Sequence, residues 1–210
     1  MMTKKTRSPR HTSDPTSLMI DAALTLAARD GWAHLSISNI ANAAGVPLSD
    51  ALTRFSSKQV LLNTFRDQID KTVIDGTDTD TFDQTARDRL FDIIMRRLDA
   101  LGPWKEGIAA ISRDTLRDPL ENLCCHDLNR SMGLMIECAG LSSAGLRGSA
   151  RTYGLTIIYL IVLHRWLKDD STDMAPTMAE LDKKLKSIEQ FLQRFQPDIP
   201  TYYKKTANKN

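Results

Sequence analysis

The sequence predicts an all-α protein with a small N-terminal helix-turn-helix domain and a larger C-terminal helical domain. Apolar residues recur every three or four positions along most of the chain, which is the spacing of helices that bury one face. Glycine, proline and short polar runs separate these segments, and no segment alternates apolar and polar residues convincingly as a half-buried strand does.

The bulk composition fits a globular protein and excludes several classes. The net charge is only +2, so any binding of nucleic acid must come from a local patch. The N-terminus lacks the apolar segment of a secretory signal, and the longest apolar run, residues 155–163, is far short of the ~20 residues that span a bilayer. We therefore expect a cytoplasmic protein with no stable membrane insertion.

The reactive side chains are few and scattered. Cys124, Cys125 and Cys138 have neither a disulfide-framework pattern nor metal-ligand spacing, which suits a reducing compartment. The chain has none of the common catalytic or nucleotide-binding motifs. Its one cluster of reactive types, Cys124, Cys125 and His126, is either a buried pair of small side chains or a thiol sensor. We expect no enzymatic activity, no cofactor and no metal.

Residues 1–13 are expected to form a basic, disordered arm. They are polar and carry Lys4, Lys5, Arg7 and Arg10, with no acidic residue among them. The arm either adds nonspecific grip on nucleic acid or is only a solubilising tail.

The first predicted helix runs from Asp14 to Gly31. Asp14 offers a side-chain acceptor and Pro15 a favourable first-turn residue, and Gly31 supplies a left-handed stop. Its apolar positions are Met19, Ala22, Ala23 and Leu26.

The next two predicted helices, residues 36–44 and 48–55, form the helix-turn-helix. Ser36 and Asn39 are a weak capping pair, and Gly45 supplies the backbone angle that the tight turn requires. The inner face of the first helix is Ile37, Ile40, Ala41 and Ala44. Val46, Leu52 and Phe55 are expected to pin the second helix to the first. Ser49, Asp50 and Thr53 would then face a DNA groove.

A fourth predicted helix completes this domain, which we place at residues 14–74. Ser56 and Gln59 have the spacing of a capping box at its start, and apolar positions continue to Val73. The acidic, polar run over residues 75–83 follows and predicts the main domain boundary.

The second domain is predicted over residues 84–196, with a polar tail at 197–210. Its helical patterns cover roughly 84–101, 103–115, 119–139, 146–169 and 174–196. The last one has a seam of apolar residues that belongs either to the core of one chain or to a dimer interface. The seam consists of Met178, Leu181, Leu185, Ile188, Leu192 and Phe195.

The N-terminal segments "MIDAALTLAARDGW", "ISNIANAAGV" and "RFSSKQVLL" together resemble the DNA-binding domain of TetR/AcrR-type transcriptional regulators. The resemblance covers about residues 17–66 and keeps the family's order and spacing. It implies a TetR-like fold, a homodimer, and a helical ligand domain in which a small apolar effector changes the separation of the two DNA-reading helices. It also implies a pseudo-palindromic operator of double-stranded DNA as partner.

The predicted DNA contacts follow from this resemblance and include departures from the family pattern. The family usually has a capping serine or threonine where this chain has Pro47, and a phosphate-contacting tyrosine where it has Leu52. Asp50 would repel phosphates, although it could accept from a cytosine amino group. Arg54 is compatible with DNA, and Lys58 matches a lysine that holds a phosphate. The full set of expected contacts is Ser36, Pro47, Leu48, Ser49, Asp50, Thr53, Arg54 and Lys58.

The charge of this region is modest. Residues 1–75 contain nine Lys or Arg and seven Asp, a difference of +2, and four of the nine cations belong to the arm. The arm is therefore a candidate for the main electrostatic grip, for example in a minor groove.

The C-terminal part is similar to a second group, the TetR-shaped accessory proteins of ubiquinone biosynthesis, which bind lipid and support a hydroxylase. The similarity spans about residues 86–186, through "RDRLFDIIMRRLDALGPWKEGIAAISRD" and "SARTYGLTIIYLIVLHRWLKDDSTDMAPTMAELDKKL". The same group also has the "DGW" of residues 30–32. It implies a fold that is not used on DNA.

Both resemblances imply an apolar pocket in the second domain. Each candidate lining residue is better explained as ordinary helical core than as ligand wall, because methionine and aromatic residues at helical spacing occur in any helical core. Arg96 and Arg97 could meet an acidic ligand, although a surface salt bridge is the preferred interpretation. The candidates are Phe91, Ile94, Met95, Leu98, Trp104, Ile108, Ile111, Met132, Met135, Tyr153, Ile157 and Tyr159.

Two hypotheses result. The first, which we favour, is a TetR-type DNA-binding regulator, most simply a repressor, whose operator binding responds to a small apolar ligand. The alternative is a lipid-binding accessory protein of ubiquinone biosynthesis that does not bind DNA. Arg54 and Lys58 favour the first, whereas Asp50 and Leu52 favour the second.

Overall fold

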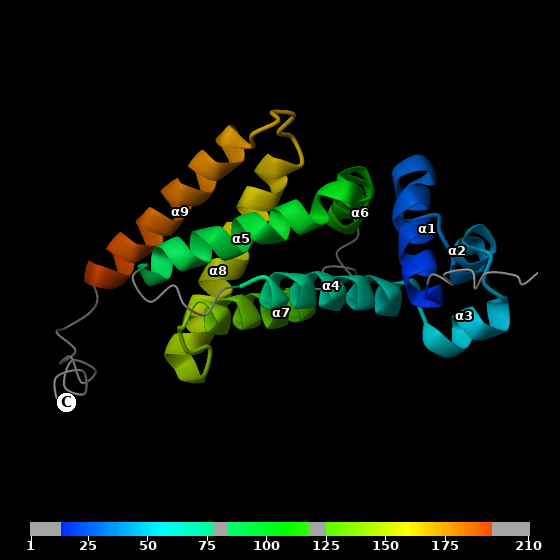
Figure 1. The fold of residues 1–210 in the computed structure, drawn as a ribbon, viewed down its shortest axis with the longest axis horizontal. Coiled ribbons are helices and arrows are strands. Elements are labelled where there is room, and N and C mark those ends of the chain that lie inside the picture. The colour runs from blue at the N-terminus through cyan, green and yellow to red at the C-terminus, as the bar shows by residue number, and fades with distance from the viewer. Residues whose placement is uncertain (1–13, 78–83, 118–124, 195–210) are drawn as a thin grey trace, which may run out of the picture. The chain divides into compact units, whose positions relative to one another are not determined.

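The computed structural model describes residues 14–77, 84–117 and 125–194, and this part of the chain consists of helices and their connections, with no strand (Figure 1). The all-α prediction is confirmed. The predicted arm, the tail and Cys124 lie outside the described residues. The helices are α1 (Pro15–Asp30), α2 (Ile37–Ala44), α3 (Leu48–Arg54), α4 (Lys58–Asp75), α5 (Ala86–Leu101), the 3₁₀ turn η1 (Gly102–Trp104), α6 (Lys105–Arg117), α7 (Cys125–Cys138), α8 (Gly145–Trp166) and α9 (Ala175–Arg194).

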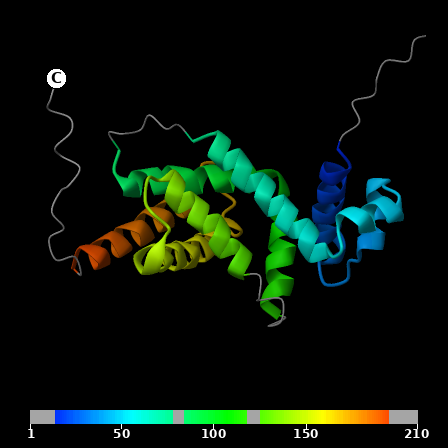
Figure 2. The same cartoon turned by 90° about the horizontal axis from the view of Figure 1, so that it is seen from below.

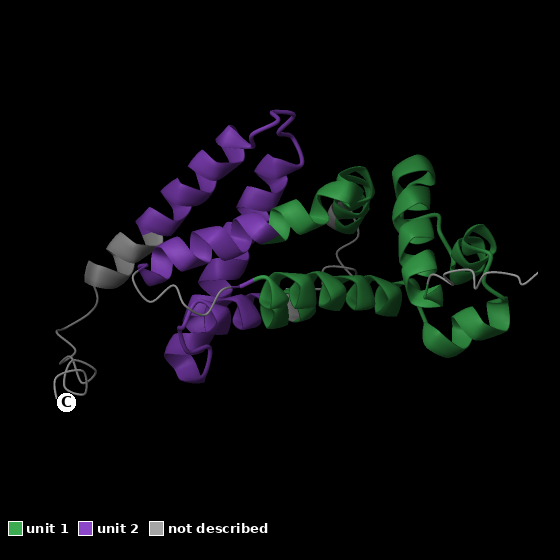
Figure 3. Cartoon of the chain, viewed as in Figure 1, with its two compact units in different colours: residues 1–76, 97–131 green, residues 77–96, 132–210 purple. Residues whose placement is uncertain are grey.

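The helices form two compact units (Figure 3). Unit 1 contains residues 1–76 and 97–131, and unit 2 contains residues 77–96 and 132–210. The first break between the units falls at the start of the acidic run. Whether the two units correspond to a DNA-binding domain and a ligand domain stays a prediction.

Two helix starts differ from the sequence prediction. α1 begins at Pro15 as expected, but the side chain of Asp14 accepts no capping hydrogen bond. At the start of α4 the cap is Ser57, whose Oγ accepts from the backbone N–H of Val60 at 3.3 Å, so the capping box from Ser56 is wrong. At the start of α4 two serines stand in a row, and only the backbone path decides which one caps.

α6 packs against α1 inside unit 1. A Cβ on Gly107 of α6 would lie 2.5 Å from the carbonyl oxygen of Leu24, so the absence of a side chain permits this close crossing. Next to it, the rings of Phe65 and Trp104 meet edge to face at 5.2 Å, and Trp104 Nε1 donates to Asp21 Oδ1 at 3.1 Å. These contacts join α1, α4 and α6 into one core.

A charged cluster is buried in the same unit. Asp70 of α4 is paired with Arg97 of α5 and also accepts a hydrogen bond from Ser131 Oγ of α7 at 2.5 Å. Arg97 is only 2% exposed, which corrects the expectation of a surface salt bridge at this position. The neighbouring Arg96 is half-buried and donates to Thr77 Oγ1 at 3.1 Å.

In unit 2, α8 packs along α9, and the two helices lie side by side in both views (Figure 2). Leu181 and Leu185 of the α9 seam are buried, which supports the intramolecular interpretation for these two positions, whereas Met178 is exposed. The side chains of seam residues 188, 192 and 195 lie outside the described part.

Asp169 ties the connection between α8 and α9 to the start of α9. One carboxylate oxygen accepts from the backbone N–H and hydroxyl of Ser171, and the other accepts from the N–H and hydroxyl of Thr177. The carboxylate thus fixes the turn between the two helices.

Candidate nucleic-acid interface

The start of α2 is fixed by a reciprocal pair of hydrogen bonds. The N–H of Asn39 donates to Ser36 Oγ at 3.2 Å, and the N–H of Ser36 donates to Asn39 Oδ1 at 3.1 Å. The expected capping pair is confirmed as a full capping box, with Asn39 in the position that glutamate usually takes.

The turn between α2 and α3 depends on Gly45. Its φ of +67° and ψ of 25° are left-handed, a conformation that side chains resist. The N–H of the next residue, Val46, donates back to Ala41 at 3.0 Å, and the Val46 side chain is buried. The chain therefore leaves α2 at a set angle and enters α3 two residues later.

α3 rests on α2 through a different residue than predicted. Ala51 is fully buried and Phe55 nearly so, whereas Leu52 is 51% exposed. The expectation that Leu52 pins α3 to α2 is wrong, because the short side chain of Ala51 lets the two helices approach and takes that position. Leu52 therefore faces outward with Leu48, four residues before it.

The other expected contacts on α3 are exposed as well. Ser49, Asp50, Thr53 and Arg54 all lie at the surface of unit 1. The Thr53 hydroxyl donates to the carbonyl oxygen of Ser49 at 2.8 Å, and the Ser49 hydroxyl donates to Asp50 Oδ1 at 3.3 Å. Pro47, also exposed, caps the helix through its carbonyl oxygen, which accepts from the N–H groups of Asp50 and Ala51.

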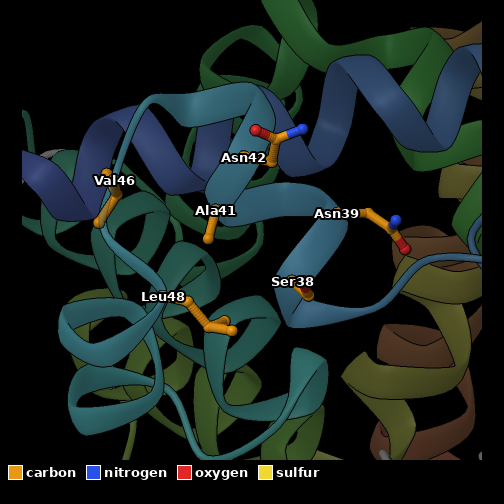
Figure 4. A pocket seen from close by; sticks show the side chains of 6 residues that line it. All are labelled: Ser38, Asn39, Ala41, Asn42, Val46 and Leu48. Atoms are coloured by element: carbon orange, nitrogen blue, oxygen red, sulfur yellow. The ribbon is translucent and has the colours of Figure 1, made fainter.

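α2 contributes polar side chains that the sequence analysis did not single out. Ser38 and Asn42 are exposed and line a shallow pocket of about 340 Å³, together with Asn39, Ala41, Val46 and Leu48 (Figure 4). The sequence could have indicated these polar groups, because Ser38 and Asn42 are four residues apart and lie on the side of α2 away from the buried Ile37 and Ile40. In helix-turn-helix proteins the first helix crosses the phosphate backbone, which is a suitable place for such groups.

Lys58, the expected phosphate contact, is held against the loop that follows α1. Its Nζ donates to the carbonyl oxygens of Trp32 at 2.9 Å and Ala33 at 3.4 Å, and it lies 5.1 Å from the centre of the Trp32 ring. An ammonium group has three donors, so one is left for a phosphate. The lysine therefore has a structural role whether or not it contacts DNA.

The candidate ligand-pocket residues differ widely in exposure and are divided between the two units. Leu98, Met132 and Met135 are fully buried, whereas Tyr153 and Ile157 are each 60% exposed. The pocket itself stays a prediction. Of the remaining candidates, Ile94, Ile111 and Tyr159 are buried, and Phe91, Met95, Trp104 and Ile108 are half-buried.

The described residues contain no group of three or more metal-binding side chains that could hold an ion. No helix among them is long and apolar enough to cross a membrane.

Comparison with known proteins relates this architecture to one class. No protein-family model and no curated protein matches the chain. Among solved structures, it is similar to the TetR transcriptional regulator from Nitrosomonas europaea, with 22% identity and a TM-score of 0.68 over 85% of this chain and 99% of that one. A TetR transcriptional regulator from Rhodococcus sp. RHA1 is also similar, with 16% identity and a TM-score of 0.61 over 83% of this chain and 94% of that one.

At these identities the likeness establishes the fold. The protein has the TetR-regulator fold, as the N-terminal resemblance implied, and it matches nearly the full length of both regulators. The likeness of the C-terminal part to accessory proteins of ubiquinone biosynthesis stays a prediction.

Proposed function

We propose that the protein is a TetR-type transcriptional regulator that binds a DNA operator as a homodimer. The observation that carries the proposal is the complete helix-turn-helix, with α2 capped by Ser36, the turn set by Gly45, and the outer side of α3 left open. Among the described residues of unit 1, none covers the outer side of Leu48, Leu52 or Arg54, which leaves α3 free to enter a major groove.

The charge distribution gives the N-terminal arm a defined part in this function. Over residues 14–75 there are five Lys or Arg against seven Asp, so the helix-turn-helix region alone does not attract phosphates. The four cations of residues 1–13 reverse that balance. We propose that the arm supplies nonspecific affinity and that α3 supplies sequence preference.

A homodimer is supported by an apolar stripe on α8. Tyr153, Ile157, Leu160 and Ile161, together with Leu146 near the start of the helix, follow helical spacing and are between 39% and 89% exposed. Exposed apolar stripes of this length mark association surfaces, and a twofold homodimer would match the twofold symmetry of a palindromic site. Tyr153 and Ile157 fit this interface better than a ligand pocket.

The effector and the sense of regulation complete the proposal. A small apolar molecule would bind among the buried methionines and leucines of the helices that follow α4 and would release the operator, so the protein would act as a repressor. The buried Met132 and Met135 suit an adaptable apolar site, because methionine side chains are flexible and polarisable.

The test is binding of the purified protein to DNA from its own promoter region, measured by fluorescence anisotropy against scrambled DNA at two salt concentrations. We expect a preference for promoter DNA that Arg54→Ala weakens and that Arg113→Ala, an exposed arginine on α6, leaves unchanged. Weak binding that is equal on both DNAs and lost in moderate salt would contradict the proposal.

The second candidate function, a lipid-binding accessory protein, is favoured by a specific feature of α3. Leu48 and Leu52 are exposed and Asp50 adds a negative charge where a DNA-reading helix commonly has polar or basic groups. Organic extraction of the purified protein, followed by mass spectrometry, would return a stoichiometric lipid if this candidate were correct.

A further inference from the structure

The outward side of α3 carries two leucines that the core of unit 1 does not use. Leu48 is 45% exposed and Leu52 is 51% exposed, while Ala51 and Phe55 already fill the side of α3 that faces the protein. Leu48 and Leu52 are four residues apart, so their side chains lie next to each other on the helix surface. Adjacent exposed leucines form a small apolar surface, and such surfaces mark contact sites more often than single exposed residues do.

The hydroxyl groups on α3 are not available as donors. The Thr53 hydroxyl donates to the carbonyl oxygen of Ser49, and the Ser49 hydroxyl donates to Asp50. Each hydroxyl has one proton to give, and the Asp50 carboxylate can only accept. Apart from the exposed Asp50 carboxylate and Arg54 guanidinium, the outer side of α3 therefore presents mainly methyl and methylene groups to a DNA groove.

Only one base edge in the major groove is complementary to such a surface. Adenine, guanine and cytosine present hydrogen-bonding groups there, whereas thymine adds an apolar 5-methyl group. We propose that Leu48 and Leu52 each contact the 5-methyl group of a thymine, so that every operator half-site contains two thymines read through their methyl groups. This inference rests on the proposed DNA-binding function.

The helix geometry limits the separation of the two thymines. Four residues advance about 6 Å along a helix, and successive bases on one strand are ~3.4 Å apart. The two methyl groups therefore belong to bases no more than about two steps apart.

DNA is the occupant that the surroundings of these leucines favour. Leu48 borders the pocket that Ser38 and Asn42 also line, so the apolar contact is continuous with the polar groups of α2 that suit phosphates (Figure 4). Arg54 lies at the other end of α3, and its positive charge offsets the negative charge of Asp50. An acyl chain or an apolar protein surface would not require polar and positively charged groups beside the two leucines.

The experiment begins with selection of preferred sites from a pool of random duplexes by the full-length protein. Each thymine in the selected half-site is then replaced singly by deoxyuridine, which lacks only the 5-methyl group, and affinity is measured by fluorescence anisotropy. We expect two positions per half-site at which the replacement weakens binding about fourfold, the effect of one buried methyl group. The other positions should change little.

Variants assign each methyl group to its leucine. Leu52→Ala should abolish the deoxyuridine penalty at one of the two positions and Leu48→Ala at the other, with the Tm unchanged because both side chains are exposed. Leu18→Ala on α1, which removes a leucine that is 37% exposed outside the helix-turn-helix, is the matched control and should keep both penalties.

The outcomes separate this inference from the proposed function. Tight, sequence-preferring binding that is insensitive to deoxyuridine would overturn the inference and leave the regulator intact. Penalties that persist in both leucine variants would also overturn it. If the selection enriches no DNA sequence, the proposed DNA-binding function is contradicted, and this inference fails with it.

Discussion

The ammonium group of Lys58 at the start of α4 lies 2.9 Å from the carbonyl oxygen of Trp32 and 5.1 Å from the centre of the indole ring of the same residue. Trp32 is 1% exposed and sits in the loop between α1 and α2. A single cation thus donates a hydrogen bond to a backbone carbonyl and makes a cation–π contact with a buried aromatic ring. The lysine therefore ties the start of α4 to the loop between α1 and α2.

Replacing Lys58 by methionine should therefore reduce stability as well as DNA affinity. The methionine keeps most of the apolar stem but loses the charged hydrogen bond and the cation–π contact, together worth about 1–3 kcal/mol. Urea unfolding followed by circular dichroism measures the loss, and Lys71→Met, an exposed lysine further along α4, is the control. An unchanged free energy of unfolding with weaker DNA binding would assign Lys58 to the phosphate alone.

Asp50 should weaken DNA binding in the native protein. It is exposed on α3, and in a groove its negative charge would face phosphates. We expect Asp50→Asn to raise affinity by roughly 3–10-fold at low salt, with a smaller gain at high salt because the repulsion is screened. Anisotropy titrations at several salt concentrations measure this, with Asp67→Asn on α4 as a control. If Asp50→Asn instead loses affinity for a site containing a cytosine, the carboxylate reads that base.

Features with local causes could be predicted from the sequence. Gly45 and the pair of Ser36 and Asn39 are visible because a tight turn and a helix start need those residue types at those positions. The outward position of Leu52 could not be predicted, because α3 is less than two turns long and hydrophobicity alone places a leucine inside. The burial of Arg97 was equally hidden, since its partner is 27 positions away on another helix. Most of the fold therefore followed from sequence, as did the exposure of Ser49, Asp50 and Thr53, whereas the outward position of Leu52 did not.

Gly107 is expected to be intolerant of any side chain. A Cβ there would be 2.5 Å from the carbonyl oxygen of Leu24, a backbone atom that cannot move alone, so α6 and α1 would have to separate. We expect Gly107→Ala to destabilise the protein by about 1–3 kcal/mol despite the better helix propensity of alanine. Gly133→Ala in α7, where the nearest atom is 3.9 Å away, is the matched control and should be neutral or stabilising. Equal effects of the two variants in thermal unfolding would contradict the close crossing.

Asp169 should make stability depend on pH in the acid range. Hydrogen bonds from the side chains of Ser171 and then Thr177 hold the pKa of its carboxyl well below the ordinary value of 3.8. A carboxyl whose pKa is lowered by folding contributes stability above the pKa of the unfolded chain and loses that contribution as the pH falls toward the folded pKa. We expect Asp169→Asn to lower the Tm at neutral pH and to flatten its fall between about pH 5 and pH 3. The exposed Asp170→Asn is the control, and identical pH profiles for the two variants would contradict this role.

Removing one charge of the Asp70–Arg97 pair should lower the free energy of unfolding strongly, whereas removing both charges should lower it much less. Both side chains are almost fully buried, and Asp70 also accepts from Ser131, so three helices of unit 1 meet at one carboxylate. Asp70→Leu alone or Arg97→Met alone leaves a buried charge without its counter-ion, which typically costs about 3–5 kcal/mol. The double variant removes both charges and should recover a large part of that loss, since apolar side chains of similar volume can replace a buried ion pair.

Urea unfolding of the four proteins in a double-mutant cycle gives the coupling free energy, and losses that simply add would show that the two side chains act independently. A strong coupling would mean that the position of α4, the helix that follows the helix-turn-helix, is fixed by a charge pair with α5.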